Sequence, residues 1–155
     1  MLISDYEQSK MSQGIRQLFL EIYPDDPSLA EKMNFNENRV RHICTKVAMI
    51  NGKIVGQANV FSFKGRPDIA NLGYHIHPDY RNQGIGEKLS KATIDKVKNT
   101  ALSILLIRTE LKNIGSIKLA RKLGFTEPTN EFQKANEELI SSDNIKEMIC
   151  MVLDL

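Results

Sequence analysis

Residues 76–86 read IHPDYRNQGIG. This stretch leads from the end of an expected strand, through a short loop, into the start of an expected helix. Gly84 and Gly86 allow the backbone to turn tightly and leave N–H groups that no side chain covers. Those N–H groups and the positive end of the helix dipole favour an anion, and Arg81 adds a permanent charge that can reach a phosphate. The stretch therefore predicts a pyrophosphate site.

Two better-known glycine-rich loops fit this stretch poorly. A Walker loop needs Gly-Lys-Ser/Thr, whereas residues 86–88 are Gly-Glu-Lys. A dinucleotide-binding fingerprint needs a third small residue three positions after the second glycine, where this chain has Leu89. Taken alone, the glycine pair is also compatible with a purely structural turn, or with a small nucleotide-phosphate binder that prefers ATP or NAD to coenzyme A.

Upstream of this stretch, the hydrophobic pattern changes from a helical period to a period of two. Residues 8–23 carry apolar side chains on one helical face, and the helix is expected to end at Pro24. Asn51-Gly52 is a strong hairpin signal, because both residues tolerate a positive φ. The sequence predicts an edge strand at residues 1–3, a short second helix at 28–35, and an antiparallel meander with strands at 42–50, 53–63 and 69–77 and a second turn at 64–67.

Downstream of Pro78, helices and strands alternate. The sequence predicts a helix at residues 84–98, an almost unbroken apolar strand at 102–107, a helix at 114–123 that ends at Gly124, and a terminal strand at 147–153. The polar residues before the last strand form either a loop or a short helix. A strand–helix–strand unit of this length requires a parallel, right-handed crossover. We therefore predict an α+β fold in one domain over residues 1–155, with a mixed sheet flanked by helices.

The composition excludes several classes of protein. Lys and Arg number 21 and Asp and Glu 19 among 155 residues, a net charge of +2 that argues against a nucleic-acid binder. No apolar run approaches the length of a membrane span, and the N-terminus lacks the basic and apolar regions of a secretory signal. Cys44 and Cys150 are expected to be buried, reduced thiols of a cytoplasmic protein.

A second motif follows one strand later, at residues 113–125, which read NIGSIKLARKLGF. Together the two motifs resemble those of the GNAT superfamily of acyl-CoA-dependent N-acetyltransferases. The first family motif is matched by Arg81, Gly84 and Gly86, with Pro78 and Tyr80 before them. The second is matched by Asn113, Ser116, Leu119, Lys122, Gly124 and Phe125. The expected order of helices and strands also fits the family fold over nearly the whole chain.

The resemblance implies a site for acetyl-CoA as cosubstrate. The molecule would lie in a V-shaped opening between the strand that ends at His77 and the strand at 102–109, with its pantetheine arm along the backbone near Ile76 and His77. The pyrophosphate would lie on the N–H groups of residues 81–86, and Asn113 would hydrogen-bond the cofactor. The implied cofactor-binding residues are Ile76, His77, Arg81, Asn82, Gln83, Gly84, Ile85, Gly86, Asn113 and Ser116.

The implied reaction is direct attack of a neutral primary amine on the thioester carbonyl, with a backbone N–H near Ile76 stabilising the developing oxyanion. One departure concerns the general acid, because Ala120 stands where the family often has a tyrosine. Water, Ser116 or Tyr74 would then protonate the leaving thiolate. The usual carboxylate in the third meander strand is also missing, which leaves Tyr74, His75 and Glu110 as candidate bases. We take Tyr74 and Glu110 as the predicted catalytic residues.

Three questions stay open from the sequence. The departures at the acid and base also fit a catalytically weak or inactive acyl-CoA-binding or sensing module on the same fold. His75 and His77 lie on one side of a strand and would bind a metal with His42 as third ligand, although surface histidines are the expected alternative. The acceptor is a small-molecule or peptide amine of unknown identity. No nucleic acid or membrane partner is expected, and the terminal strand would allow a homodimer.

Acidic residues surround the expected acceptor pocket of the family. They are Asp25, Asp26, Glu31 and Glu37 in one segment, and Glu131, Glu137, Glu138 and Asp143 before the last strand. Either they attract a cationic acceptor, or they are ordinary solvated loop charges.

Overall fold

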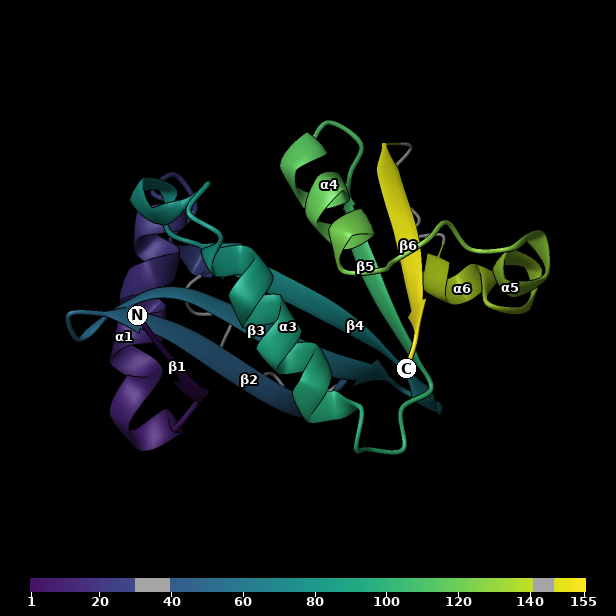
Figure 1. The fold of residues 1–155 in the computed structure, drawn as a ribbon, viewed down its shortest axis with the longest axis horizontal. Coiled ribbons are helices and arrows are strands. Elements are labelled where there is room, and N and C mark those ends of the chain that lie inside the picture. The colour runs from purple at the N-terminus through teal and green to yellow at the C-terminus, as the bar shows by residue number, and fades with distance from the viewer. Residues whose placement is uncertain (30–39, 141–146) are drawn as a thin grey trace.

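The computed structural model describes residues 1–29, 40–140 and 147–155. In this part of the chain, six strands form one sheet in chain order (Figure 1). They are β1 (Leu2–Asp5), β2 (Val40–Ile50), β3 (Lys53–Phe63), β4 (Arg66–Ile76), β5 (Ile104–Glu110) and β6 (Met148–Asp154). All neighbouring strands are antiparallel except β4 and β5, which are parallel, so the sheet is mixed as predicted.

The parallel pairing of β4 and β5 is short. Only residues 69–71 of β4 pair with residues 104–106 of β5, after which β4 continues along β3 and β5 continues along β6. The two strands consequently separate toward their carboxyl ends (Figure 1). The V-shaped opening that the sequence led us to expect is the result.

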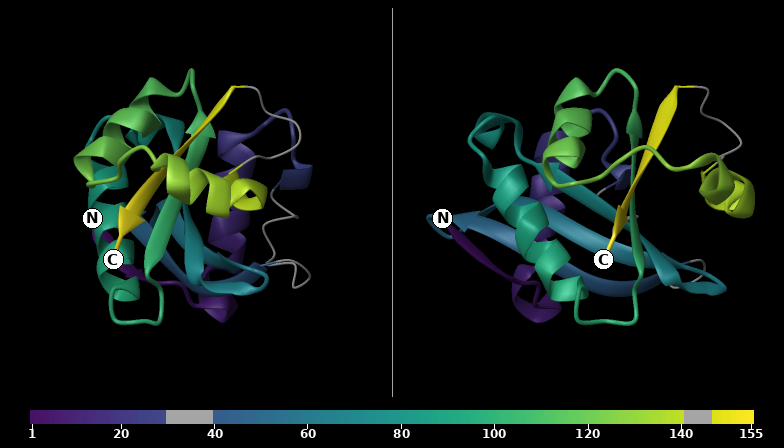
Figure 2. Two further views of the ribbon diagram at one scale, coloured as in Figure 1. Left: turned by 90° about the vertical axis from the view of Figure 1, so that its right-hand side faces the viewer. Right: turned by 45° about the vertical axis from the view of Figure 1, so that its right-hand side comes forward.

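Helices cover both faces of the sheet (Figure 2). The helical segments are α1 (Gln8–Ile22), the 3₁₀ turn η1 (Pro78–Tyr80), α3 (Ile85–Val97), α4 (Ile114–Lys122), α5 (Asn130–Ala135) and α6 (Glu137–Ile140). Val47 and Ile54 pack against α1, whereas the next residues along each strand, Ala48 and Val55, join the core under α3 and α4. Because successive strand residues point to opposite faces, α1 lies on one side of the sheet and α3 with α4 on the other.

Most predicted elements match, and the differences have local reasons. The strand predicted at 53–63 coincides with β3, and the hairpin residues Asn51 and Gly52 have φ of 50° and 77°. The turn predicted at 64–67 is shorter, because Gly65, at φ 79°, already reverses the chain and β4 begins at Arg66. The strand predicted at 102–107 lies at Ile104–Glu110, because the polar residues after Ile107 still pair with β6.

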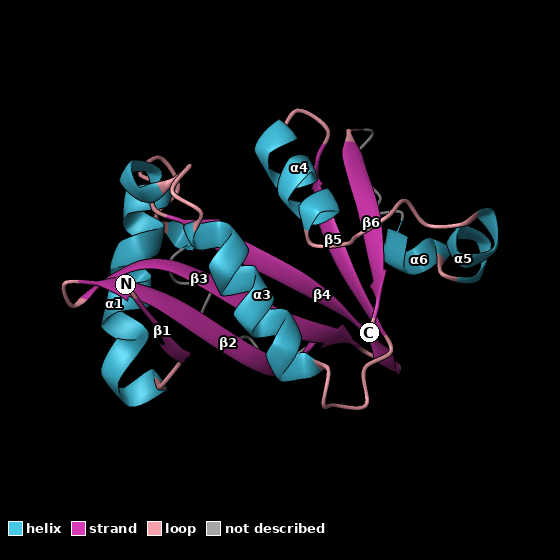
Figure 3. Ribbon diagram, viewed as in Figure 1, coloured by secondary structure: helices cyan, strands magenta, loops and turns pink. Residues whose placement is uncertain are grey.

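The connection between α4 and β6 holds the short helices α5 and α6 (Figure 3), which decides between the loop and the helix that the sequence left open. The short helix predicted at 28–35 falls largely outside the described residues. Cys44 and Cys150 are free thiols, and burial raises the pKa of both, that of Cys150 to about 11. Among the described residues, none of the helices has the length and apolar character that crossing a membrane requires.

Candidate active site

A cleft of about 480 Å³ lies between β4 and the segment that follows β5. Its walls come from the end of α1, the last residues of β4, the loop and first turn of α3, and one side of α4 along its length. Both sequence motifs therefore meet at one cavity, although one strand separates them in the sequence.

The start of α3 forms one wall of the cleft without a side-chain cap. Gly84 is the residue before the helix and has a φ of 74°, and Asn82 has a φ of 60°. A Cβ atom on Gly84 would meet no atom within 4 Å, so the space beyond it is open. The first N–H groups of a helix have no partner inside the helix, and here they adjoin open space in the cleft. The geometry is that of an anion cradle.

Gly86 has a different function from Gly84. A Cβ atom there would lie 3.3 Å from Cδ2 of Leu119, in α4, and 3.6 Å from Ile76. Its missing side chain lets α3 approach α4 and β4 closely. The first glycine thus supplies the backbone conformation, and the second supplies the close packing.

Backbone groups of β4 follow the alternation of an antiparallel ladder. The N–H of His77 donates to the carbonyl of Val55 in β3 (2.9 Å), and its carbonyl accepts from the N–H of Tyr80 (2.9 Å). Neighbouring residues of a strand point their backbone groups in opposite directions, so those of Ile76 point toward β5 and the cleft. Of the predicted backbone surface, the Ile76 part therefore faces the cleft, and there the Ile76 carbonyl already accepts from Nε of Arg81 (3.1 Å).

Polar side chains from β4 and α4 meet in the cleft. The hydroxyl of Tyr74 donates to Oγ of Ser116 (2.8 Å), and burial raises the pKa of Tyr74, so it stays protonated at neutral pH. Asn113 caps α4, because its Oδ1 accepts from the N–H of Ser116 (3.1 Å). Both residues of the second motif are thus held in place by local hydrogen bonds.

Cationic side chains outnumber anionic ones on the cleft wall. Arg81, Lys118 and Lys122 line it, against Glu87 alone among the described acidic residues. Glu87 is itself paired with Lys122 (2.6 Å) and Lys91 (2.8 Å). This excess of positive charge favours an anionic ligand.

The acetyltransferase (GNAT) family matches residues 9–125. The chain belongs to this family. The resemblance that the two motifs suggested is thereby confirmed, and the α+β fold class with it.

Among curated proteins, the chain is similar to the L-methionine sulfoximine/L-methionine sulfone acetyltransferase of Salmonella typhimurium, with 30% identity over 79 residues. It is also 30% identical over 78 residues to the L-amino acid N-acyltransferase MnaT of Escherichia coli. The matches cover 49% and 48% of this chain, and 46% and 45% of the relatives. The chain thus spans about half the length of the curated relatives it matches.

Solved structures share the fold along the whole chain. The ribosomal-protein-alanine N-acetyltransferase from Brucella melitensis has a TM-score of 0.73 at 19% identity and covers 100% of both chains. The Salmonella typhimurium protein yncA, solved with its cofactor acetyl-CoA, has a TM-score of 0.70 at 18% identity, covering 99% of this chain and 93% of that one. At these identities the likeness concerns the GNAT fold.

Within this GNAT domain, most of the predicted cofactor residues line the cleft. They are Ile76, Arg81, Asn82, Gly84, Ile85, Gly86, Asn113 and Ser116. His77 and Gln83 do not line it, because His77 points toward α1 and the Gln83 amide donates to the carbonyl of Asp79 (3.0 Å). Both side chains shape the loop instead.

The structure separates the candidate bases. Tyr74 and His75 line the cleft, whereas Glu110 does not; it is exposed and pairs with Lys112 (2.9 Å). The ring of His75 lies 4.8 Å from that of Phe19 and 6.0 Å from that of Tyr23. Burial, followed by the nearby Arg81, lowers the pKa of His75 to about 4. The imidazole is therefore neutral at neutral pH, and its Nδ1 is buried with no hydrogen-bond partner in the described part of the chain.

The other sequence hypotheses find no counterpart in the cleft. The described residues hold no group of three or more His, Cys, Asp or Glu side chains that could bind a metal, and His42 contacts Thr45 in β2 (2.9 Å). The acidic side chains Asp25, Asp26, Glu131, Glu137 and Glu138 are exposed, and none lines the cleft. Glu31, Glu37 and Asp143 lie outside the described residues.

We expect the stability of the His75→Phe variant to fall less steeply than that of the parent as the pH is lowered. The unfolded chain takes up a proton at the ordinary pKa of 6.5, but the folded protein only near 4, so the stabilising contribution of neutral His75 is complete above pH 6.5 and disappears as the pH falls to 4. The measurement is Tm between pH 7.5 and 4 for both proteins. The lowered pKa of His75 would be contradicted if Tm fell equally steeply with pH in both proteins, or if NMR showed His75 titrating near 6.5.

Proposed function

We propose that this protein is an N-acetyltransferase that transfers the acetyl group of acetyl-CoA to a primary amine of a small molecule or peptide. One observation carries the proposal: the uncapped start of α3, entered through a left-handed Gly84, opens into a cleft that Arg81, Lys118 and Lys122 make cationic. Membership of the GNAT family supports the reaction class.

The residues present fit acetyl-CoA. The N–H groups at the start of α3 and the guanidinium of Arg81 would hold its pyrophosphate. The β4 edge beyond residue 71 would adjoin its pantetheine arm, because this edge faces the cleft and lacks a strand partner in the described chain. The N–H of Ile76 is the group offered there, since the Ile76 carbonyl accepts from Nε of Arg81. Asn113 and Ser116 would contact it from the opposite wall. When bound, acetyl-CoA supplies an acyl thioester with an electrophilic carbonyl.

Two groups of the chain would serve the transfer itself. The N–H of Ile76 would donate to the carbonyl oxygen as negative charge develops on it. Tyr74 would protonate the departing thiolate, since its raised pKa keeps the proton available and Ser116 holds the hydroxyl in place. In this proposal Tyr74 performs the task that a tyrosine at position 120 performs in other family members; Ala120 is fully buried and does not line the cleft.

For the base we favour His75 over Glu110. The low pKa keeps the imidazole unprotonated at neutral pH, and since Nδ1 is buried, Nε2 is the nitrogen that would take the proton. Glu110 is exposed and ion-paired away from the cleft, and we leave it out of the proposed machinery. Tyr74 would be spared for the acid step.

The acceptor is proposed to be a small amine such as an amino acid. The curated relatives are named for L-amino acids and for L-methionine sulfoximine and sulfone, which supports this class. The cleft wall beside His75 consists of Ile22 and Tyr23, and no described carboxylate of the rim reaches it, so a polycation has little support. The two free thiols support a reducing compartment such as the cytoplasm.

A second candidate function is a non-catalytic acyl-CoA-binding module on the same fold. Ala120 in the place of the usual tyrosine is the observation that favours it. Such a protein would bind acetyl-CoA but release no thiol with any amine.

Acetyl-CoA should bind and raise Tm, since it binds the folded state alone. Gly84→Val should weaken this binding by about tenfold or more, because a β-branched side chain resists a φ of 74° and would cover the N–H groups. A thermal melt measures the rise in Tm, and calorimetric titration measures the Kd of acetyl-CoA for the parent and the variant. Gly65→Val is the matched control, because Gly65 has a φ of 79° and equally open surroundings far from the cleft. Equal losses in the two variants, or none in Gly84→Val, would show that the cradle is misplaced.

Thiol release from acetyl-CoA should occur with a panel of amino acids and other small amines. Tyr74→Phe should lower kcat by about 100-fold, the usual contribution of a general acid, and leave the Kd of acetyl-CoA nearly unchanged. An unchanged kcat would exclude Tyr74 as the acid. Binding without thiol release for every amine would favour the non-catalytic alternative.

A further inference from the structure

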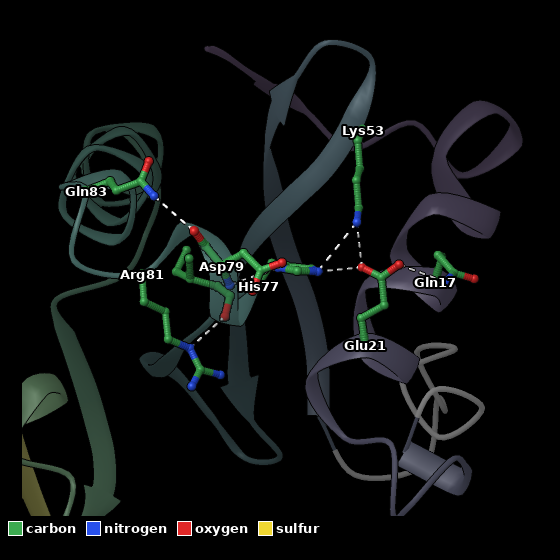
Figure 4. A network of polar contacts seen from close by, with 8 residues as sticks. Gln17, Glu21, Lys53, His77, Asp79, Arg81 and Gln83 are labelled. Atoms are coloured by element: carbon green, nitrogen blue, oxygen red, sulfur yellow. Dashed lines mark hydrogen bonds and ion pairs between the residues drawn. The ribbon is translucent and has the colours of Figure 1, made fainter.

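A polar network connects the last turn of α1 to the loop that precedes α3 (Figure 4). Its centre is the carboxylate of Glu21. Nε2 of His77 lies 2.6 Å from Oε2 of this carboxylate, and Nζ of Lys53 lies 2.8 Å from the same oxygen. The amide of Gln17, one turn earlier in α1, donates to Oε1 (2.9 Å).

The hydrogen bonds of His77 assign its tautomer. Its Nδ1 accepts from the N–H of Asp79 (3.1 Å), so the ring proton is on Nε2, the nitrogen that lies against the Glu21 carboxylate. Nζ of Lys53 lies 3.5 Å from Nε2, but both nitrogens are donors and cannot bond to each other. Both nitrogens instead contact the same carboxylate oxygen, Oε2 of Glu21.

His77 is the residue on which the loop is built. It is 6% exposed, and its backbone N–H and carbonyl bond Val55 and Tyr80. Its ring caps η1 through Asp79 and lies 5.4 Å from the ring of Tyr80. The orientation of this ring therefore fixes the 3₁₀ turn that leads to the start of α3.

The other end of the network adjoins the part of the cleft wall that the end of α1 contributes. Glu21 directly precedes Ile22 and Tyr23, which line the cleft, and His77 directly follows Ile76, which also lines it. A hydrogen bond from Lys53, then one from Gln17, hold the pKa of Glu21 at about 2, so the carboxylate is charged throughout the neutral range. A charged acceptor holds a buried donor more firmly than a neutral one.

We propose that Glu21 is a positioning residue: through His77 it holds the η1 loop in the conformation that presents the start of α3 to the pyrophosphate of acetyl-CoA. The inference rests on the proposed function, since it concerns how tightly that cofactor is held. Glu21 itself does not touch the ligand. It acts by keeping the loop preorganised, which lowers the entropy that binding must remove.

The first test is calorimetric titration with coenzyme A, which needs no acceptor amine. Glu21→Ala should raise the Kd of coenzyme A by about tenfold, because the imidazole N–H of His77 would lose the charged group against which it lies and the loop would be held less firmly. Glu21→Gln retains an oxygen that can accept from His77 and should remain within about threefold of the parent. Glu7→Gln is the matched control, because Glu7 lies at the start of the same helix in an exposed ion pair with Lys10 (2.6 Å). Glu7→Gln should leave the Kd of coenzyme A unchanged.

The second test approaches the same contact from the loop. In His77→Asn, the shorter side chain can still accept from the N–H of Asp79 but cannot reach Glu21. It should raise the Kd as Glu21→Ala does, and the double variant should be no worse than either single one, because both remove the same contact. In an assay with saturating acceptor amine and varied acetyl-CoA, kcat should stay within about twofold while the KM of acetyl-CoA rises.

The outcomes separate this inference from the proposed function. If the parent protein does not bind coenzyme A, the proposed function fails and the inference with it. If the parent binds and folded Glu21→Ala and His77→Asn bind equally well, the inference alone is wrong. Additive effects of the two substitutions, or a fall in kcat without a change in Kd, would likewise overturn it.

Discussion

The site depends on where two parallel strands stop pairing. β4 and β5 share a ladder only at residues 69–71 and 104–106, after which each continues with its other neighbour. Backbone N–H and carbonyl groups require hydrogen-bond partners, so a strand edge that ends its pairing inside the protein is a natural place for an extended ligand. The divergence exposes this edge of β4 at Ile76 and leaves room for α3 and α4 to bring their first turns to either side of it.

The two glycines of the first motif show how one short segment satisfies two physical requirements. Gly84 adopts a left-handed backbone that directs the chain into α3 and leaves its first N–H groups uncovered. Gly86 allows Leu119 of α4 to approach the helix. The cradle and the helix contact that closes the cleft thus depend on different properties of the same residue type, its backbone freedom in one case and its small volume in the other.

Charge and burial are distributed unevenly around the cleft. Cations gather on the walls next to the α3 cradle, while His75 is neutral and lies among aromatic rings near the end of α1. The cationic walls suit a cosubstrate that carries phosphates, and the neutral surroundings of His75 suit an uncharged amine. The Glu21–His77 contact joins α1 to the η1 loop, beside the cleft.

The sequence by itself determined most of the elements, because hydrophobic periods, turn residues and capping glycines act locally, and its two motifs indicated the family. Asn51-Gly52 and Gly124 are examples, and residues 84–86 could be assigned for the same reason.

Only the tertiary structure decided which side chains enter the cleft. The backbone of His77 was expected to bind the cofactor, but in the alternating pattern of the β4–β3 ladder its N–H points toward β3. Glu110 was expected near the reacting atoms, but the extended pairing of β5 with β6 leaves it at an exposed strand end. Glu21 was not singled out at all, since its function depends on a contact between segments far apart in the chain, and such contacts follow from packing, which no local pattern encodes.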